Sequence, residues 1–388
     1  MNGSQRIELP TGLMELTVDA SERFALNDLI GFAARANVRR GFLFLSKVLG
    51  KHWPVTPHQM LAIHDELATR VPVELRGPII FIALAETAIG LGQGVFESWK
   101  GAHPESEALF LHTTRYHVGT TPLIEFEEAH SHAPRQFLHH PQGAGHQDLL
   151  RQARSLVLVD DEASTGKTFL NLTAACRALS PALERVHLAA ITNFMGRAAS
   201  QALSLRFGLK TTVGAALSGD YAFTPGQLQP AAGVAQLFEA HADRGASACF
   251  GRLGTARALA SPQALAQRLR SGIAPHERVL VLGTGEFMHM AFLLGRALEA
   301  DDVDVVVQST TRSPILQWGA ISHILKFPDN YGEGVENFLY NVAPCQYAHV
   351  FICHETHPNA ALRQFAQSVQ GRLFYFLSET QIEEISVR

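Results

Sequence analysis

The chain has 388 residues, which is enough for two domains of ordinary size. A hydrophobic content of 46% and a formal net charge of −4 are typical of a soluble globular protein, and they exclude a nucleic-acid binder that relies on bulk positive charge. No apolar signal segment opens the chain, the longest apolar stretch (78–94) is short for a membrane span, and the four cysteines form no C-x-x-C pair, so we expect a cytoplasmic protein with reduced thiols.

A basic segment, residues 39–52, is the first candidate functional element. It reads Arg-Arg-Gly-Phe-Leu-Phe-Leu-Ser-Lys-Val-Leu-Gly-Lys-His. Lys47 and Lys51 are four positions apart and would share a face if the segment were helical. The segment is either a hood that covers a ligand or a buried strand or helix with a solvated basic edge.

Two apolar runs that follow predict buried strands of a parallel sheet. Residues 78–84 lead into a loop of small residues, 85–88, which would let an anion approach the backbone closely, although an ordinary strand-to-helix turn has the same pattern. Residues 108–112 lead into Thr-Thr-Arg, where Arg115 is a candidate to neutralise an anion. Solvated arginines are also common at strand ends.

Residues 119–147 are rich in His, Pro, Gly and Glu and show no period, so we predict a long structureless loop. Such loops in compact domains are usually functional. The segment 127–133, which contains His130 and His132, is its most promising part. Further histidines in this loop raise the alternative of a metal site, but their spacing matches no ligand motif, and we expect no dedicated metal site in the protein.

The most informative stretch is residues 156–168, Leu-Val-Leu-Val-Asp-Asp-Glu-Ala-Ser-Thr-Gly-Lys-Thr. The apolar run predicts a strand buried on both faces, which places Asp160 and Asp161 at its carboxyl end, where open α/β sheets bind ligands. Residues 164–168 then form a turn that opens a helix, and the free N–H groups of a helix start suit a phosphate. A P-loop needs glycine at position 161, where a carboxylate would repel phosphate, so Gly-Lys-Thr is a chance resemblance to that motif.

The whole string resembles the phosphoribosyl-pyrophosphate (PRPP) signature of type I phosphoribosyltransferases: four apolar residues, two acids, three variable positions and Thr-Gly-x-Thr. An acidic N-cap pair before a helix is the alternative. The resemblance implies that the acids hold the ribose hydroxyls, that the following loop holds the 5-phosphate, and that residues 85–88 hold pyrophosphate. Lys167 departs from the usual glycine and would add a charge to the phosphate site.

The resemblance further implies that residues 119–147 close over PRPP and that the basic segment meets its phosphates. The implied PRPP-binding residues are Lys47, Lys51, Ala85, Glu86, Thr87, Ala88, Asp160, Asp161, Glu162, Ala163, Ser164, Thr165, Gly166, Lys167 and Thr168. The implied catalytic residues are Arg115, His130, His132, Asp160 and Asp161.

A narrower resemblance rests on these segments together with Ser-His-Ala at 131–133 and Thr-Arg-Ser-Pro at 311–314. They resemble the phosphoribosyltransferases of bacterial tellurite-resistance and stress-response operons, which carry a C-terminal domain named TRSP after the last motif. This implies PRPP and a base-like acceptor as substrates, Mg²⁺ bound mainly through PRPP, and an unusual nucleotide-like product. A homodimer and other proteins of the same operon are candidate partners, whereas nucleic acid and a membrane span are not expected.

The second half of the sequence repeats the plan of the first. A strand with a small-residue turn, a strand that ends in Thr-Thr-Arg, and a strand that ends in polar residues recur in the same order at 278–289, 304–312 and 349–356. Glu86 precedes Arg115 by 29 positions, and Glu286 precedes Arg312 by 26. Order and spacing indicate an internal duplication, so we predict a diverged, Rossmann-like phosphoribosyltransferase fold for the C-terminal domain.

The second domain lacks a Thr-Gly-x-Thr loop, and Cys353-His354-Glu355 replaces its acidic pair, so we expect it to have lost ordinary PRPP binding. We favour a ligand or phosphate pocket over a nucleophile or metal set, because neighbours on a strand point to opposite faces. A purely structural role is the third alternative. The predicted pocket residues are Gly283, Thr284, Gly285, Glu286, Thr311, Arg312, Ser313, Cys353, His354 and Glu355.

The sequence therefore predicts an α/β protein of two domains with mainly parallel sheets. Turn-forming residues cluster at 224–233, which predicts a phosphoribosyltransferase domain over 1–228 and a TRSP domain over 234–388. The predicted function is PRPP-dependent phosphoribosyl transfer with release of pyrophosphate. The alternatives are a regulator that senses PRPP without turnover and, more weakly, an ATP-using P-loop enzyme.

Overall fold

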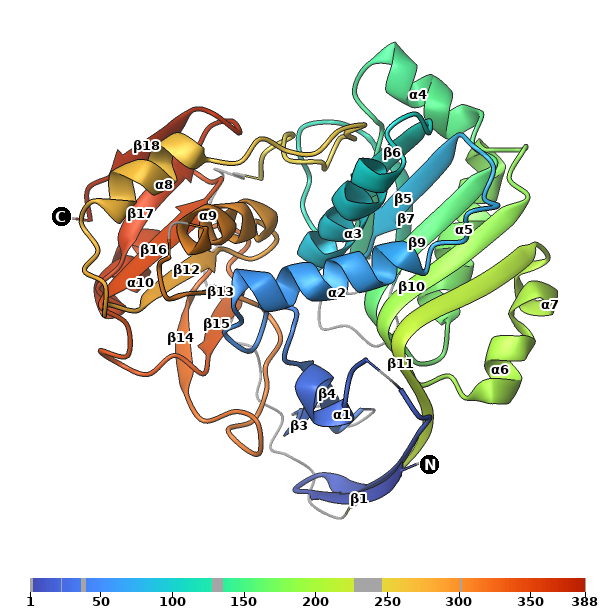
Figure 1. Ribbon diagram of the computed structural model, residues 1–388, viewed down its shortest axis with the longest axis horizontal. Coiled ribbons are helices and arrows are strands. Elements are labelled where there is room, and N and C mark those ends of the chain that lie inside the picture. Colours follow the sequence, from blue (N-terminus) through green and yellow to red (C-terminus); the bar gives the residue numbers. More distant parts are fainter. Residues whose placement is uncertain are drawn as a thin grey trace.

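The computed structural model describes residues 3–21, 23–35, 40–127, 135–226, 246–300 and 302–387. The predicted catalytic residues His130 and His132 lie outside these ranges, as does most of the predicted domain boundary. The described chain forms two α/β halves that lie side by side (Figure 1). None of its described helices has the length and apolar character needed to cross a membrane.

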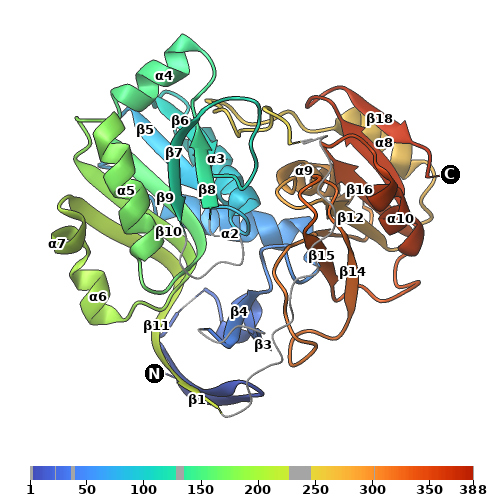
Figure 2. The same ribbon diagram turned by 180° about the vertical axis from the view of Figure 1, so that it is seen from behind.

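The first half is built on a seven-stranded sheet. In spatial order its strands are β6 (Ala108–His112), β5 (Ile79–Ala83), β9 (Ser155–Ala163), β10 (Arg185–Asn193), β11 (Lys210–Pro225), β2 (Gly12–Val18) and β1 (Gly3–Leu9). The first five are parallel, and β2 and β1 form an antiparallel extension. The central strands are almost continuous apolar runs, because helices cover both faces of the sheet (Figures 1 and 2).

The helices of the first half divide between the two faces. One face carries α2 (Pro57–Thr69) and α3 (Ile89–Ala102), and the other carries α4 (Ala144–Arg151), α5 (Lys167–Leu179), α6 (Arg197–Gln201) and α7 (Leu203–Phe207). Two hairpins complete this half. The first pairs β3 (Ile30–Ala34) with β4 (Phe42–Ser46), and the short helix α1 (Leu26–Leu29) directly precedes β3. The second pairs β7 (Pro122–Glu127) with β8 (Arg135–His139).

The second half has a five-stranded sheet. Its order is β13 (Val305–Ser309), β12 (Val279–Gly283), β16 (His349–His354), β17 (Arg372–Phe376) and β18 (Ile382–Ile385), and only β18 is antiparallel to its neighbour. One face packs against α8 (Gln263–Arg270) and α9 (His289–Glu299). The other packs against α10 (Ala360–Ser368) and the hairpin of β14 (Ile324–Pro328) and β15 (Glu336–Tyr340).

The two sheets share a topology, which supports the predicted duplication. The order β6-β5-β9-β10 of the first half recurs as β13-β12-β16-β17 in the second. Ile79 begins β5 opposite Ala108, as Val279 begins β12 opposite Val305. Strands β9 and β16 pair with β5 and β12 in matching register. These registers make three pairs of positions equivalent: Glu86 and Glu286, Arg115 and Arg312, and Asp161 and Glu355.

Segments of each half extend the sheet of the other. Val55, from the first half, pairs with Val307 in β13. Thr255, which leads into the second half, pairs with Phe110 in β6. Helix α2 runs between the halves and packs against both α3 and α9 (Figure 1). The halves are therefore interlocked rather than joined by one linker.

Two sequence predictions about local structure were wrong, and one conditional expectation does not apply. The strand predicted to end before the acids continues to Ala163, because the chain goes on pairing with β10. Residues 119–147 are not structureless, because their described part contains β7, β8 and the start of α4. The many His and Pro residues interrupt the apolar pattern from which these elements could have been predicted. Residues 47–53 form bends rather than a helix, so Lys47 and Lys51 share no helical face.

Candidate functional site

The acidic pair lies at the carboxyl end of β9. Residues 155–159 of the strand are buried, whereas Asp160 and Asp161 are only partly buried. Asp161 Oδ1 accepts a hydrogen bond from Thr87 Oγ1 at 3.0 Å, which joins the pair to the loop after β5. Ionised carboxylates only accept hydrogen bonds, so this edge suits a ligand with neighbouring hydroxyl groups.

The amino end of α5 follows the acids directly. Gly166, at the N-cap, has a φ of 70°, a left-handed conformation that favours glycine. No side chain caps the helix, so the N–H groups of its first turn suit an anion. Arg206 Nη2 donates to the carbonyl oxygen of Thr165 at 2.9 Å and fixes the turn from outside. Lys167 is exposed beside this helix start.

A ring of hydrogen bonds fixes the loop after β5. The Ala85 N–H donates to Thr113 Oγ1 at 2.8 Å, the Thr113 hydroxyl donates to Gln136 Oε1 at 2.7 Å, and Gln136 Nε2 donates to the Ala85 carbonyl at 3.1 Å. Gln136 is a buried residue of β8. The loop, the end of β6 and the β7–β8 hairpin are therefore one rigid support beside the acidic pair.

A buried ion pair lies one residue further along this loop. Lys51 Nζ is 2.7 Å from Glu86 Oε1, and it donates to the Gly285 carbonyl of the second half at 2.7 Å. Burial lowers the pKa of Lys51, and the Glu86 charge counteracts this. Burial raises the pKa of Glu86, but the charges of Lys51, Arg312 and Arg115 outweigh burial and lower it to about 2. Three cations therefore act on the Glu86 carboxylate, and Arg312 among them also pairs with Asp329 and Glu333.

The described part of the basic segment forms β4 and the bends after it, and we call the β3–β4 hairpin with these flanks the predicted hood. Arg40 Nη2 donates to both carboxylate oxygens of Glu162, at 2.6 and 2.7 Å, and so ties the hairpin to the end of β9. The Arg40 guanidinium also lies 4.9 Å from the ring centroid of Phe42. Aromatic rings pack behind this contact: Phe42, Phe44, Phe194, Tyr221 and Phe223.

The predicted second-domain pocket is a contact between the halves in this structure. Thr114 Oγ1 and the Arg115 N–H donate to the Glu286 carboxylate at 2.6 and 2.8 Å. Arg252 Nη2 lies 3.2 Å from the same carboxylate. The cavity beside these groups has a volume of about 10 Å³, which is room for about one water. The packed interface therefore leaves no space for a ligand there.

Cys353, His354 and Glu355 do not converge. Burial raises the pKa of Cys353 far above its ordinary value, so its thiol is inert. Burial lowers the pKa of His354 to about 4, and its ring stacks on Tyr375 at a centroid distance of 5.4 Å. Glu355 instead accepts hydrogen bonds from both terminal nitrogens of Arg252, at 2.9 and 2.8 Å. No nucleophile or metal set is formed by these three residues.

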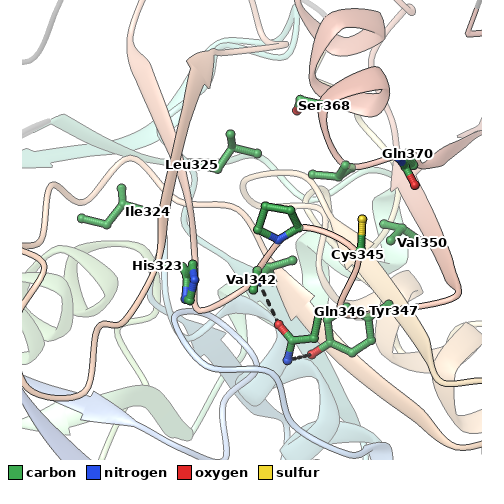
Figure 3. Close-up of a pocket in the computed structure, with 13 residues that line it drawn as sticks. His323, Ile324, Leu325, Val342, Cys345, Gln346, Tyr347, Val350, Ser368 and Gln370 are labelled. Carbon is green, nitrogen blue, oxygen red and sulfur yellow. Dashed lines mark hydrogen bonds between the residues drawn. The ribbon is translucent and has the colours of Figure 1, made fainter.

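A larger cavity, of about 250 Å³, lies elsewhere in the second half (Figure 3). It adjoins Val350 near the amino end of β16, the opposite end from Glu355. No Lys, Arg, Asp or Glu lines it, so it does not suit a phosphorylated ligand. Among the residues that the structure describes, no three His, Cys, Asp or Glu side chains gather as a metal site.

The structure brings most predicted PRPP-binding residues to one edge of the first sheet. Lys47 is an exception: its Nζ donates to the Asn27 carbonyl at 2.9 Å, within the hood. Sequence reasoning missed Arg40, Gln136 and Arg252 as functional candidates. Only Arg40 had a signal, as part of the basic segment. Gln136 and Arg252 sit in stretches without a period, and their partners lie far along the chain.

Two family models match the chain in tandem. One, described as phosphoribosyl transferase, matches residues 29–220, and the other, described as TRSP domain C terminus to PRTase_2, matches residues 250–369. None of the curated proteins compared with the chain matches it.

Similar solved structures include adenine phosphoribosyl transferase from Trypanosoma brucei, with 14% identity over 55% of this chain and 86% of that chain and a TM-score of 0.34. Adenine phosphoribosyltransferase from Thermoanaerobacter pseudethanolicus has 13% identity over 41% and 80%, with a TM-score of 0.28. Hypoxanthine phosphoribosyltransferase from Staphylococcus aureus has 12% identity over 38% and 70%, with a TM-score of 0.24. By its two family models, the chain belongs to the phosphoribosyltransferases that carry a C-terminal TRSP domain, and it is a pentosyltransferase.

Proposed function

We propose that this protein transfers the 5-phosphoribosyl group of PRPP to a base-like acceptor, releases pyrophosphate and forms an unusual nucleotide-like metabolite. One observation carries the proposal. The acidic pair of β9 is followed directly by the amino end of α5, and the hydrogen bond from Thr87 to Asp161 joins the pair to the loop at 85–88. This arrangement offers acceptors for ribose hydroxyls between two sites for phosphate groups.

The chemistry requires no protein nucleophile. A ring nitrogen of the acceptor attacks C1 of the ribose as the bond to pyrophosphate breaks, through a transition state that resembles an oxocarbenium ion. Asp160 and Asp161 orient the ribose, and the α5 amino end holds its 5-phosphate. Lys51 and Arg115 lie near Glu86, where positive charge stabilises the departing pyrophosphate.

Mg²⁺ is proposed as the cofactor, bound mainly through the oxygens of PRPP. The partly buried carboxylates of Asp160 and Asp161 are oxygen ligands of the kind that Mg²⁺ accepts, so the donors at this edge fit the ion. When bound, Mg²⁺ would neutralise phosphate charge. With or without the ion, Asp160 and Asp161 would hold and orient the sugar.

Exclusion of water is the proposed role of the two hairpins. The β7–β8 hairpin is anchored beside the site by Gln136, and the hood is anchored by the Arg40–Glu162 pair. Closure over bound PRPP would keep water from hydrolysing it. We place the activity in the cytoplasm, in the context of tellurite resistance and stress, with a homodimer and proteins of the same operon as candidate partners.

A regulator that senses PRPP without turnover is the second candidate. The observation that favours it is the Lys51 side chain, which links Glu86 in the first half to the Gly285 carbonyl in the second. A phosphate that competes for Lys51 would therefore disturb a contact between the halves. Occupancy of the site could then be read by the TRSP domain.

Release of pyrophosphate from PRPP separates these candidates. The purified protein with Mg²⁺ would be offered nucleobases, nucleosides and amines, and products would be identified by mass spectrometry. We expect stoichiometric pyrophosphate and a new ribosylated product with at least one acceptor. Tight PRPP binding without pyrophosphate release from any acceptor would overturn the enzymatic proposal and favour the sensor.

A further inference from the structure

We propose that Arg312, of the second half, is part of the site of the first half and binds the pyrophosphate group of PRPP. This inference rests on the proposed function, because it takes PRPP as the ligand. Arg312 follows β13 as Arg115 follows β6, and only 7% of its surface is exposed. Its contact with Tyr116 and its charge interaction with Glu86 place the TRSP motif beside the loop at 85–88.

The guanidinium of Arg312 has buried donors without acceptors. Nε and Nη2 have no hydrogen-bond partner among the described residues. Nη1 donates to Glu333 at 2.9 Å, whereas Asp329 lies 3.6 Å from Nη2, beyond hydrogen-bond distance. Most buried polar groups in proteins are hydrogen-bonded, and a guanidinium presents its donors as a fork that fits two phosphate oxygens. These donors therefore suit an anionic ligand.

The surroundings of Arg312 connect it to the acidic pair. Its guanidinium lies 4.6 Å from the ring centroid of Tyr116, and its charge acts on Glu86. Glu86 precedes Thr87, which binds Asp161. A diphosphate that extends from a ribose at the acidic pair along this loop would thus meet Arg312.

The equivalent position in the second half, around Glu286, is already occupied by protein groups. Glu286, the counterpart of Glu86, is hydrogen-bonded by Thr114, by the Arg115 N–H and by Arg252. On Arg312, by contrast, Nε and Nη2 have no hydrogen-bond partner among the described residues. This side chain contacts Tyr116 of the first half, which has the acidic pair. Glu333 is 32% exposed, so water can solvate its carboxylate when phosphate oxygens take its place on Arg312.

Titration calorimetry with three ligands tests the inference. Arg312→Gln should weaken binding of pyrophosphate and of PRPP about tenfold or more, since a charge-assisted hydrogen bond is lost. Binding of ribose 5-phosphate should change less than about twofold, because its contacts lie at the acids and α5. Arg312→Lys should fall between, and Glu333→Gln, which removes the competing carboxylate, should tighten pyrophosphate binding. Arg257→Gln is the matched control, because Arg257 pairs with Glu379 at the surface.

Two results would overturn the assignment and leave the proposed function intact: an unchanged pyrophosphate affinity in Arg312→Gln, or an equal loss for all three ligands, which would indicate a structural role. Thermal melting of each variant shows whether a loss of affinity follows from unfolding. If Arg312→Gln is unfolded, the pyrophosphate affinities of Arg312→Lys and Glu333→Gln test the assignment instead. If wild-type protein binds neither PRPP nor pyrophosphate, the proposed function falls and this inference falls with it.

Discussion

Arg252 shows, at the scale of single residues, why the second half differs from the first. Glu355 has the register position that Asp161 has in the first half, but it pairs with Arg252, which also pairs with Glu286. All three side chains are almost completely buried. The acid at the position of Asp161 is therefore held inside the protein by an ion pair with Arg252.

Removal of Arg252 should take the paired cation away from two buried carboxylates, Glu286 and Glu355. We expect Arg252→Met to lower the free energy of unfolding by about 3 to 5 kcal/mol, because breaking a buried pair leaves uncompensated charge. Denaturation in urea measures the change. The exposed pair of Arg257 and Glu379 supplies the control, and Arg257→Met should cost about 1 kcal/mol or less. Equal effects of the two substitutions would contradict a structural role for Arg252.

Glu86 should make stability depend on acid pH. Its pKa in the folded protein is about 2, against an ordinary value of 4.5. The stabilisation is therefore present above pH 4.5 and is lost as the pH falls toward 2, and it is on the order of 3 kcal/mol. We expect Glu86→Gln to be less stable than wild type at pH 6 and to approach it near pH 2. A constant difference across this range, measured by unfolding, would refute the pairing.

Residues of the candidate site could be predicted from the sequence where they belong to a short local motif. The acids, the turn at 164–168 and the loop at 85–88 follow apolar strands, so their position at a sheet edge could be inferred from spacing alone. Arg252 and Gln136 could not be predicted, because no short motif encodes their contacts. Gln136 bonds to residues 23 and 51 positions away, and Arg252 bonds to carboxylates 34 and 103 positions away.

At the scale of elements, β5 and β6 were predicted to within one residue at each end, because each is a short apolar run. The β7–β8 hairpin was missed. Its sequence, Pro-Leu-Ile-Glu-Phe-Glu followed later by Arg-Gln-Phe-Leu-His, mixes apolar residues with charges and histidines over short strands. Tertiary contacts such as the one between Thr114 and Phe137 stabilise it instead.

Gln136 makes that hairpin part of the site. Gln136→Leu removes the donor to Ala85 and the acceptor for Thr113, so the loop that is proposed to bind pyrophosphate should lose its support. We expect the KM for PRPP to rise about tenfold and the free energy of unfolding to fall by about 1 to 3 kcal/mol. Gln152→Leu, at the exposed end of α4, is the control. A variant with wild-type KM would show that the hairpin does not position the loop.

At the scale of the whole molecule, the two halves share cores as well as contacts. Val55 and Met60, of the first half, belong to the apolar core of the second, and Leu316 and Trp318, of the second half, pack on the core of the first. The repeated order of strands could be predicted from the spacing of Glu86, Arg115 and their counterparts. The interlocking was not, because a repeated plan does not say how the two copies face each other.

Separation of the halves should therefore expose apolar surface. We expect residues 1–228 expressed alone to aggregate or to unfold well below the melting temperature of the full chain, and co-expression with residues 234–388 to recover a complex. Size-exclusion chromatography measures aggregation and complex formation, and thermal melting measures the stability of the fragment against the full chain. A stable, monomeric 1–228 fragment that binds PRPP with full affinity would contradict both the shared core and the role of Arg312.

The central claim is that the acids of β9 hold PRPP, and titration of PRPP with Mg²⁺ into wild type and the Asp160→Asn, Asp161→Asn double variant tests it most directly. Asp148→Asn, on the exposed face of α4, is the control. We predict that wild type and control bind PRPP and that the double variant binds it at least about a hundredfold more weakly. PRPP affinity that survives in the double variant, or binding of ATP in place of PRPP, would contradict the account.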